Sequence, residues 1–347
     1  MTRLMIALFA LAVPVVAAAQ SASVPEGIVV APGAPAVSAN TAVQQPGTVP
    51  ASTRIRRPSM VGYINDSTIE SRIRVRFDAA TGLDAADRAE FFYAKCGCYR
   101  FLPANNPAYD PDAPGPGPGV LTSADFNQFY AWAEYAVTGR LSLVGEVPFR
   151  SLKPQSFVPG TGSFGDNSGL SDVRGGVKLG LASDSNSQIT LQLLAQAPSG
   201  DSKKGLGNNR WSVEPTLLYW TQLGEYVSLE AQFGTIFPLD GSAGVPITVS
   251  DKFSGKVIYY GIGPSFDLYR RGGTRLSPVV ELVGWHVVDG FSTAENGPVD
   301  GLNILNAKFG GRLVLGSRNS LYVGYGKALT DAVWYDDVLR FEYRVGF

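Results

Sequence analysis

Apolar and polar side chains alternate over long stretches of the chain. In the last segment every second residue is apolar: Leu339, Phe341, Tyr343, Val345 and Phe347. The residues between them are Arg340, Glu342, Arg344 and Gly346. Residues 69–78 alternate in the same way. Because successive side chains of a strand point to opposite faces, this repeat of two predicts β-strands with one apolar face and one charged face.

Ten more segments with this repeat lie between these two, so twelve strands are predicted. The ten are residues 126–137, 140–152, 170–183, 188–198, 211–223, 227–239, 256–270, 276–289, 302–316 and 321–330.

The connections between these segments alternate in length. The short ones, rich in turn-forming residues, are residues 138–139, 183–187, 224–226, 271–275 and 317–320. The long ones are residues 80–124, 153–169, 199–210, 240–255, 290–301 and 331–336. Long strands with short turns on one side and long loops on the other are typical of outer-membrane barrels. The predicted fold class is therefore all-β: a 12-stranded antiparallel transmembrane β-barrel with long outer loops, short periplasmic turns and a disordered N-terminal linker.

A soluble β-sandwich would alternate too, with its apolar face turned to a packed core. The strand lengths and the loop asymmetry favour the membrane instead. Aromatic residues near strand ends, as in interfacial girdles, favour it as well. They are Trp211, Tyr219, Phe237, Tyr325, Tyr343 and Phe347.

The N-terminal residues indicate export. Arg3 precedes an apolar run over residues 4–16, and three alanines follow at 17–19, as in a cleavable signal peptide of residues 1–19. Residues 20–60 are rich in Pro and Ala, with too little apolar surface to fold, and predict a flexible linker. The barrel is expected over residues 61–347. We therefore expect the chain in the outer membrane, with membrane lipid as a partner.

Composition excludes several functions. The chain has 29 basic and 30 acidic residues, so it lacks the basic excess of a nucleic-acid-binding protein. One histidine and two cysteines are too few for His/Cys metal clusters and for most histidine-based catalysis. We expect no cofactor, no metal, no nucleic acid and no enzymatic activity.

If the apolar face meets lipid, the charged face lines the lumen. The signs of these charges are segregated by strand. Because the first and last strands pair when the barrel closes, their arginines share one wall. The predicted basic wall consists of Arg72, Arg74, Arg76, Lys308, Arg312, Arg340 and Arg344. The predicted acidic wall consists of Glu214, Glu230, Asp267 and Glu281.

Two interpretations of these walls remain open. In a hydrated lumen they create a transverse field that orients and selects solutes. Side chains that cross and pair would instead plug the lumen. Twelve strands about 4.8 Å apart and tilted about 40° give a backbone radius of about 12 Å, of which side chains take about half. We predict a channel for passive transport of small molecules, with a plugged structural or surface-interaction barrel as the alternative.

Several motifs resemble a known family. They are residues 169–181 (GLSDVRGGVKLGL), 197–201 (APSGD), 205–209 (GLGNN) and 214–219 (EPTLLY). They are similar to the outer-membrane β-barrel family named for a transporter of the meta pathway of phenol degradation. The resemblance implies a barrel that passes hydrophobic or aromatic small molecules.

Three smaller features remain. Cys96 and Cys98 lie in the first long loop, where a local disulfide, intermolecular pairing or metal capture are alternatives. His286 raises the possibility of a surface lipid hydrolase, but no serine lies two residues on, where Val288 stands. The terminal Phe347 resembles the insertion signal that the outer-membrane barrel assembly machinery binds, so that machinery is an expected partner.

Overall fold

The computed structural model describes residues 58–84, 92–93, 95–239 and 253–347. The predicted signal peptide and nearly all of the predicted linker lie outside these residues. Within the described ranges, no helix has the length and apolar character needed to cross a membrane.

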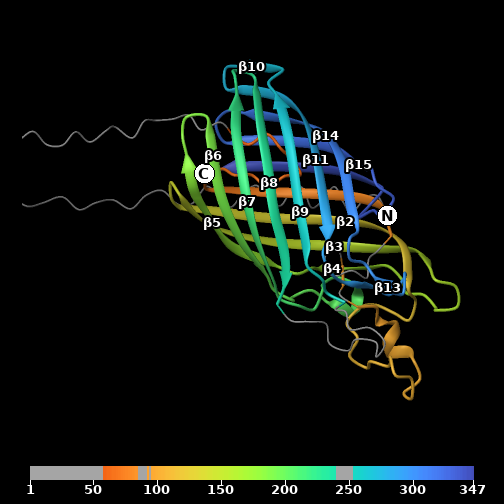
Figure 1. Ribbon diagram of the computed structural model, residues 1–347. Helices are drawn as coiled ribbons and strands as arrows, with labels where there is room; N and C mark the ends of the chain where they lie inside the picture. The colour runs from red at the N-terminus through yellow and green to blue at the C-terminus, as the bar shows by residue number, and fades with distance from the viewer. Residues whose placement is uncertain (1–57, 85–91, 94, 240–252) are drawn as a thin grey trace, which may run out of the picture. The chain divides into compact units, whose positions relative to one another are not determined.

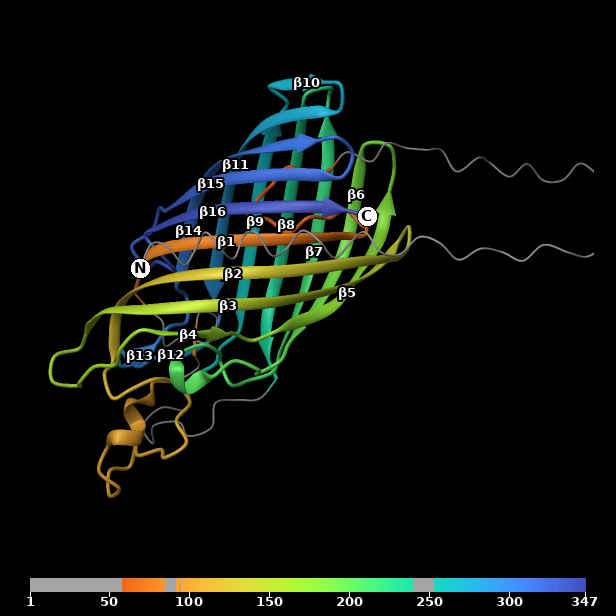
Figure 2. The ribbon, with the colours of Figure 1, turned by 180° about the vertical axis from the view of Figure 1, so that it is seen from behind.

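Twelve strands form one closed antiparallel barrel (Figure 1). They are β1 (Arg72–Leu83), β2 (Leu121–Thr138), β3 (Leu141–Phe157), β5 (Arg174–Ser183), β6 (Ser187–Gln196), β7 (Ser212–Leu223), β8 (Val227–Pro238), β9 (Val257–Phe266), β11 (Thr274–Val287), β14 (Asn303–Leu315), β15 (Asn319–Ala328) and β16 (Asp337–Gly346). Each strand pairs with its sequence neighbours in this series, and β1 pairs with β16 to close the barrel (Figure 2). The predicted 12-stranded barrel is confirmed.

Smaller elements flank the barrel. They are β4 (Asn167–Leu170), which pairs with β3, β10 (Tyr269–Arg271), which pairs with β11, the two-stranded β12 (Phe291–Ser292) and β13 (Gly297–Pro298), and the 3-10 turns η1 (Gly97–Phe101) and η2 (Ser202–Lys204). The short turns gather at one end of the barrel with β10, and β4, β12 and β13 lie at the opposite end with the long loops (Figures 1 and 2). We call these the short-turn end and the long-loop end.

The two faces of each strand meet different surroundings. On β1, Ile73 is 41% exposed on the outer wall, whereas its neighbours Arg72 and Arg74 are buried inside. On β16, Leu339, Phe341 and Tyr343 are exposed, and Arg340 and Glu342 between them are buried. An apolar outer wall around a charged interior is the pattern that a barrel needs in lipid.

Two predicted strands have different limits. The predicted strand 170–183 is interrupted at residues 171–173, because Asp172 turns away to bind a loop, as described below. The predicted strand 256–270 ends at Phe266, and Asp267 lies in the turn before β10. Alternation of apolar and polar residues along the sequence does not show such a break, because the backbone can leave the sheet without a change in that pattern.

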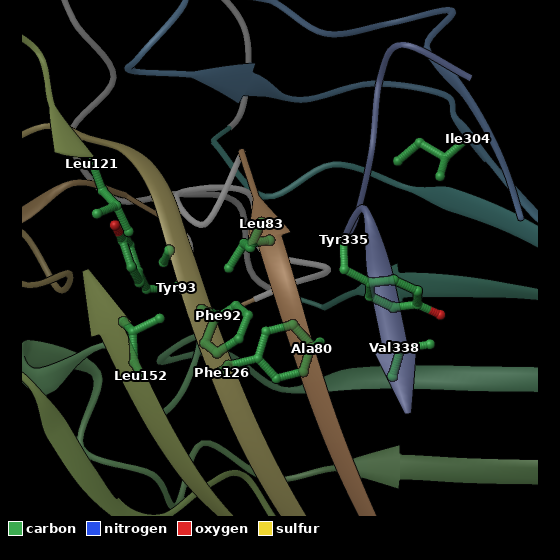
Figure 3. Packing of buried hydrophobic residues seen from close by; sticks show 11 residues of the cluster. Ala80, Leu83, Phe92, Tyr93, Leu121, Phe126, Leu152, Ile304, Tyr335 and Val338 are labelled. Carbon is green, nitrogen blue, oxygen red and sulfur yellow. The ribbon is translucent and has the colours of Figure 1, made fainter. Parts of the chain in front are cut away.

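Buried apolar side chains are concentrated toward the long-loop end. One cluster includes Ala80, Leu83, Phe126, Leu152 and Tyr335, which come from β1, β2, β3 and the loop before β16 (Figure 3). A second includes Tyr99, Val120, Phe253 and Phe291, so it joins three different long loops. These clusters narrow the lumen at this end by side-chain packing.

Candidate functional site

The lumen holds a piece of the chain itself. Residues 59–69, which we call the lumen segment, precede β1 and are not part of the sheet. Met60 and Val61 have no exposed surface, and Ile64 and Ser67 are equally buried. Their wall partners lie on the halves of the strands nearest the short turns, such as Gln188 and Thr190 of β6. The segment therefore fills the lumen at the short-turn end.

One side of the segment is held by carboxylates. Oε1 of Glu230 accepts hydrogen bonds from the backbone N–H groups of Met60 (2.9 Å) and Val61 (3.4 Å). The Glu281 carboxylate accepts those of residues 62–64, at 3.1, 2.9 and 2.8 Å. Five consecutive backbone donors thus find charged acceptors on the β8 and β11 wall, which satisfies groups that burial would otherwise penalise.

The other side is held by arginines. Arg312 of β14 donates to the carbonyls of Met60 (3.0 Å) and Val61 (2.7 Å). Arg344 of β16 also donates to the Val61 carbonyl (2.9 Å), and Arg340 donates to the next carbonyl along the chain (2.7 Å). The basic wall therefore binds the carbonyl side of the same peptides whose N–H side binds the acidic wall.

The two charged walls orient the peptide groups between them. A transverse arrangement of positive and negative charge favours dipoles that lie along it, and the peptide group is such a dipole. These contacts use the backbone, and the side chains of Met60, Val61 and Ile64 add apolar packing with the wall. The expectation that the walls orient a dipole agrees with this geometry, and here the dipoles belong to the chain.

Asp66 anchors the return of the segment toward β1. Its carboxylate accepts hydrogen bonds from the backbone N–H and the hydroxyl of Thr68, both at 2.7 Å, and pairs with Arg72 and with Arg344 (3.3 Å). Burial alone would raise the pKa of this carboxyl. The charges of Arg72, Lys178 and Arg344 lower the pKa by more than burial raises it, so it lies well below its ordinary value. The anchor is therefore ionised at neutral pH.

The remaining members of the predicted basic wall are buried and mostly paired. Arg72 binds Glu134 (2.9 Å), and Arg74 lies 3.7 Å from Glu146 and 3.8 Å from Glu342. The other contacts are Arg76 with Asp78 (3.5 Å), Arg340 with Asp78 (2.7 Å), Arg312 and Arg344 with Glu342 (2.6 Å each), and Lys308 with the Tyr335 hydroxyl.

The predicted acidic wall is less uniform than expected. Glu230 and Glu281 hold the lumen segment, whereas Glu214 accepts a hydrogen bond from Arg174 (3.4 Å). Asp267 does not line the central lumen. It lies in the turn after β9, where it pairs with Arg270 and Arg275 and accepts from the Ser277 hydroxyl (2.8 Å). Its side chain has no exposed surface, and its place in the acidic wall stays a prediction.

A cavity of about 220 Å³ lies next to the lumen segment, on its long-loop side, and we call it the chamber. Tyr63 and Asn65 of the segment contribute to its lining. Its aromatic lining consists of Phe92, Phe126, Tyr130, Tyr259, Trp285, Trp334 and Tyr335. Its charged lining consists of Arg76, Arg150, Arg174, Lys308, Arg340, Asp78, Glu146, Asp172 and Glu214. The chamber thus combines ring surfaces with cations, as small-molecule sites do.

Asp172 organises the 199–210 loop, a role that the sequence did not predict. Its carboxylate accepts hydrogen bonds from the backbone N–H groups of Gly200 (2.9 Å) and Asn208 (2.8 Å). A Cβ added to Gly207 would lie 2.4 Å from Oδ1 of Asp172, so only glycine fits there. The three family motifs around residues 172, 200 and 207 therefore meet at one structural contact. The signal in the sequence that could have indicated this contact is the position of Asp172, a charged residue where the alternation of apolar and polar residues breaks.

The cysteines and His286 show no catalytic arrangement. Sγ of Cys96 accepts a hydrogen bond from the Cys98 N–H (3.1 Å), so the two residues lie close together in the first long loop. The local disulfide considered from the sequence stays a prediction. Nδ1 of His286 lies 2.8 Å from Oδ1 of Asn303, and no described serine hydroxyl hydrogen-bonds to the ring. The absence of enzymatic activity stays a prediction.

A closed 12-stranded barrel with an apolar exterior and a charged, partly filled lumen is the fold of an outer-membrane β-barrel. An outer-membrane channel from Pseudomonas putida F1 has the same fold, with 15% identity over 83% of this chain and 100% of that chain and a TM-score of 0.50. The β-domain of the Bordetella autotransporter BrkA is less similar, with 13% identity over 80% and 100% of the two chains and a TM-score of 0.46.

The comparison with family models agrees with the motifs. Residues 107–262 match the family described as "Putative MetA-pathway of phenol degradation". The resemblance drawn from residues 169–219 is thereby confirmed, and these motifs lie inside the matched region. No curated protein matches the chain in sequence.

Proposed function

We propose that this chain is an outer-membrane channel through which small hydrophobic or aromatic molecules diffuse passively, with the lumen segment as its narrowest part. The observation that carries the proposal is that a segment of chain outside the sheet, rather than the barrel wall, occupies the short-turn half of the lumen. A segment held by hydrogen bonds can be displaced without breaking the β-sheet.

The lining of the chamber supports the solute class. Aromatic faces contribute apolar contact area to a flat solute, and the charged groups between them keep the chamber hydrated. The basic and acidic walls continue from the chamber toward the short-turn end. Displacement of the lumen segment would expose them there to a passing solute.

The test is planar-bilayer recording and liposome swelling with two proteins. One is the full chain, and the other carries a Gly/Ser sequence of equal length in place of residues 59–69. We expect small conductance steps from the full chain and steps at least several-fold larger from the replacement. If neither protein conducts, and removal of the first long loop also has no effect, the chain is not a channel.

A plugged structural or surface-interaction barrel is the second candidate. The specific observation in its favour is that both ends of the lumen are filled, by the lumen segment at one end and by joined long loops at the other. Swelling of liposomes in the presence of sugars would refute this candidate.

Assembly partners follow from the end of the chain. We propose that Phe347, which is 59% exposed beyond β16, binds the outer-membrane assembly machinery, while its N–H donates to the Ser71 carbonyl (3.0 Å). A Phe347→Ala variant should insert less efficiently into the outer membrane, measured as the fraction of heat-modifiable folded barrel in isolated membranes. Unchanged insertion would contradict the proposed interaction.

A further inference from the structure

Arg150 differs from the other arginines of the chamber. Arg76 and Arg340 share Asp78, at 3.5 and 2.7 Å, and Arg174 contacts Glu146 and Glu214. Arg150 forms no ion pair with any carboxylate among the residues that the structure describes. Its positive charge faces the chamber, where the Asp172 carboxylate interacts with it electrostatically from beyond ion-pair distance.

The contacts of Arg150 hold its guanidinium in position without using its terminal nitrogens. Nε lies 3.4 Å from Oε1 of Gln128, and the guanidinium carbon lies 4.1 Å from the centre of the Phe92 ring. Neither Nη1 nor Nη2 hydrogen-bonds to a described residue. The paired terminal nitrogens of arginine match the two oxygens of a carboxylate, and an aromatic ring beneath the guanidinium fixes its plane.

The neighbouring groups do not compete for this position. The Asp172 carboxylate, which also lines the chamber, is occupied by the N–H groups of Gly200 and Asn208 and by the Gln196 amide (3.1 Å). Lys308 is the other chamber cation without a carboxylate within ion-pair distance in the described part of the chain. It is fully buried between the Tyr63 and Tyr335 rings.

Aromatic rings extend from Arg150 across the long-loop side of the chamber. The Phe92 ring meets the Phe126 ring edge to face at 5.1 Å between centroids, and Phe126 lies 6.3 Å from Tyr335. A planar solute ring can make the same edge-to-face and stacked contacts. Because a cavity of about 150 Å³ accommodates benzene, the cavity of about 220 Å³ suits one ring with a small substituent.

We propose that the chamber is a binding site for single-ring aromatic carboxylates, with the carboxylate on Arg150 and the ring against Phe92 and Phe126. This inference rests on the proposed channel function for the solute's route to the chamber. It goes further by naming the solute class as anionic and by naming the residue that recognises the charge.

The test is isothermal titration calorimetry of the purified full chain with three probes: benzoate, benzyl alcohol and acetate. Benzoate should bind, acetate should bind at least about 10-fold more weakly because it lacks the ring, and Arg150→Gln should weaken benzoate about 10- to 100-fold. Benzyl alcohol, which has the ring without the charge, should bind the wild-type and R150Q proteins equally.

Two further variants complete the design. Arg150→Lys keeps the charge without the paired nitrogens and should restore part of the benzoate affinity. Lys153→Gln removes a positive charge from an exposed position on the same strand and should leave benzoate binding unchanged. No benzoate binding, equal binding by R150Q, or an equal loss in K153Q would overturn the inference.

The result is separable from the test of the channel. Calorimetry measures binding in detergent and needs no transport. A barrel that conducts but does not bind benzoate would retain the proposed function and lose this inference. Benzoate binding by a barrel that never conducts would retain the binding site and lose the proposed channel function.

Discussion

The two halves of the lumen are closed by different kinds of interaction. At the short-turn end, charged side chains of the wall hold the backbone of the lumen segment by its N–H and carbonyl groups, beside a small apolar cluster that includes Met60, Val61 and Ile64. At the long-loop end, apolar and aromatic side chains from strands and loops pack against one another. The first kind of contact depends on charges in the wall, and the second depends on the shape of each side chain.

The difference indicates which half can open. Aromatic packing in the long-loop half involves several elements at once, so its disruption loosens those elements together. The lumen segment lies outside the sheet and is held by wall side chains rather than by strand pairing, so it can leave while the barrel stays intact. Carbonyl and N–H groups released from the wall can then be solvated by water, as can the wall charges.

The largest effect on conductance is expected from the acidic residues of the short-turn half. Glu230→Gln combined with Glu281→Gln replaces two carboxylates by amides, so the five backbone donors find a neutral acceptor at best, which weakens each contact by about 1 kcal/mol. Planar-bilayer conductance should rise toward that of the Gly/Ser replacement. Glu225→Gln, in an exposed short turn, is the control. Unchanged conductance of the double variant would show that other residues hold the lumen segment in place.

A change in the long-loop half should affect stability more than conductance. Phe126→Ala removes a buried ring from the apolar cluster and should lower the free energy of unfolding in detergent by about 3–5 kcal/mol. Conductance should change less than in the glutamate variants, because the lumen segment stays in place. Phe129→Ala, on the exposed outer face of the same strand, is the matched control. A large conductance increase in F126A would contradict the conclusion that the short-turn half, rather than the long-loop half, opens.

Acid should release the lumen segment only at low pH. The pKa of the Asp66 carboxyl lies below its ordinary value, so its contribution is present above about pH 4 and is lost as pH falls through the lowered pKa. The contribution of Asp66 to segment binding should stay constant between about pH 5 and 8 and be lost only below about pH 4, with a rise in conductance there. Asp66→Asn should raise conductance at neutral pH and flatten the acid response. An opening near pH 6 would implicate another group.

The smallest effect is expected outside both halves of the lumen. His286→Ala removes a ring whose hydrogen bond is to Asn303, so the free energy of unfolding should change by less than about 0.5 kcal/mol and conductance should not change. Lipid hydrolysis by the wild-type protein that disappears in H286A would instead support the hydrolase alternative.

Much of the barrel was predictable because its signal is local. The alternation along residues 339–347 is visible in the sequence, and the same residues form the outer and inner faces of β16. The segregation of charge between strands was equally visible, since it needs only the strand order. The break at Asp172 was not, because its cause is a contact with residues 200 and 208 far along the chain.

The occupant of the lumen was not predictable for a related reason. Residues 59–60 were expected in the flexible linker and residue 69 in the first strand, whereas residues 59–69 lie inside the barrel and β1 begins at Arg72. The segment is bound mainly through its backbone, and every residue has the same backbone donors and acceptors. Its side chains therefore carry no periodic pattern that identifies where it lies.

The sequence by itself determined the strands, their parity, the direction in which each face points and the sign of charge on each wall. These properties depend on neighbours along one strand or on the order of strands, which the chain specifies directly. Only the tertiary structure decided what the walls bind, which arginine of the chamber pairs with no carboxylate of the described residues, and where Asp267 lies. Those outcomes depend on distances between side chains from different strands and loops, which close only when the barrel does.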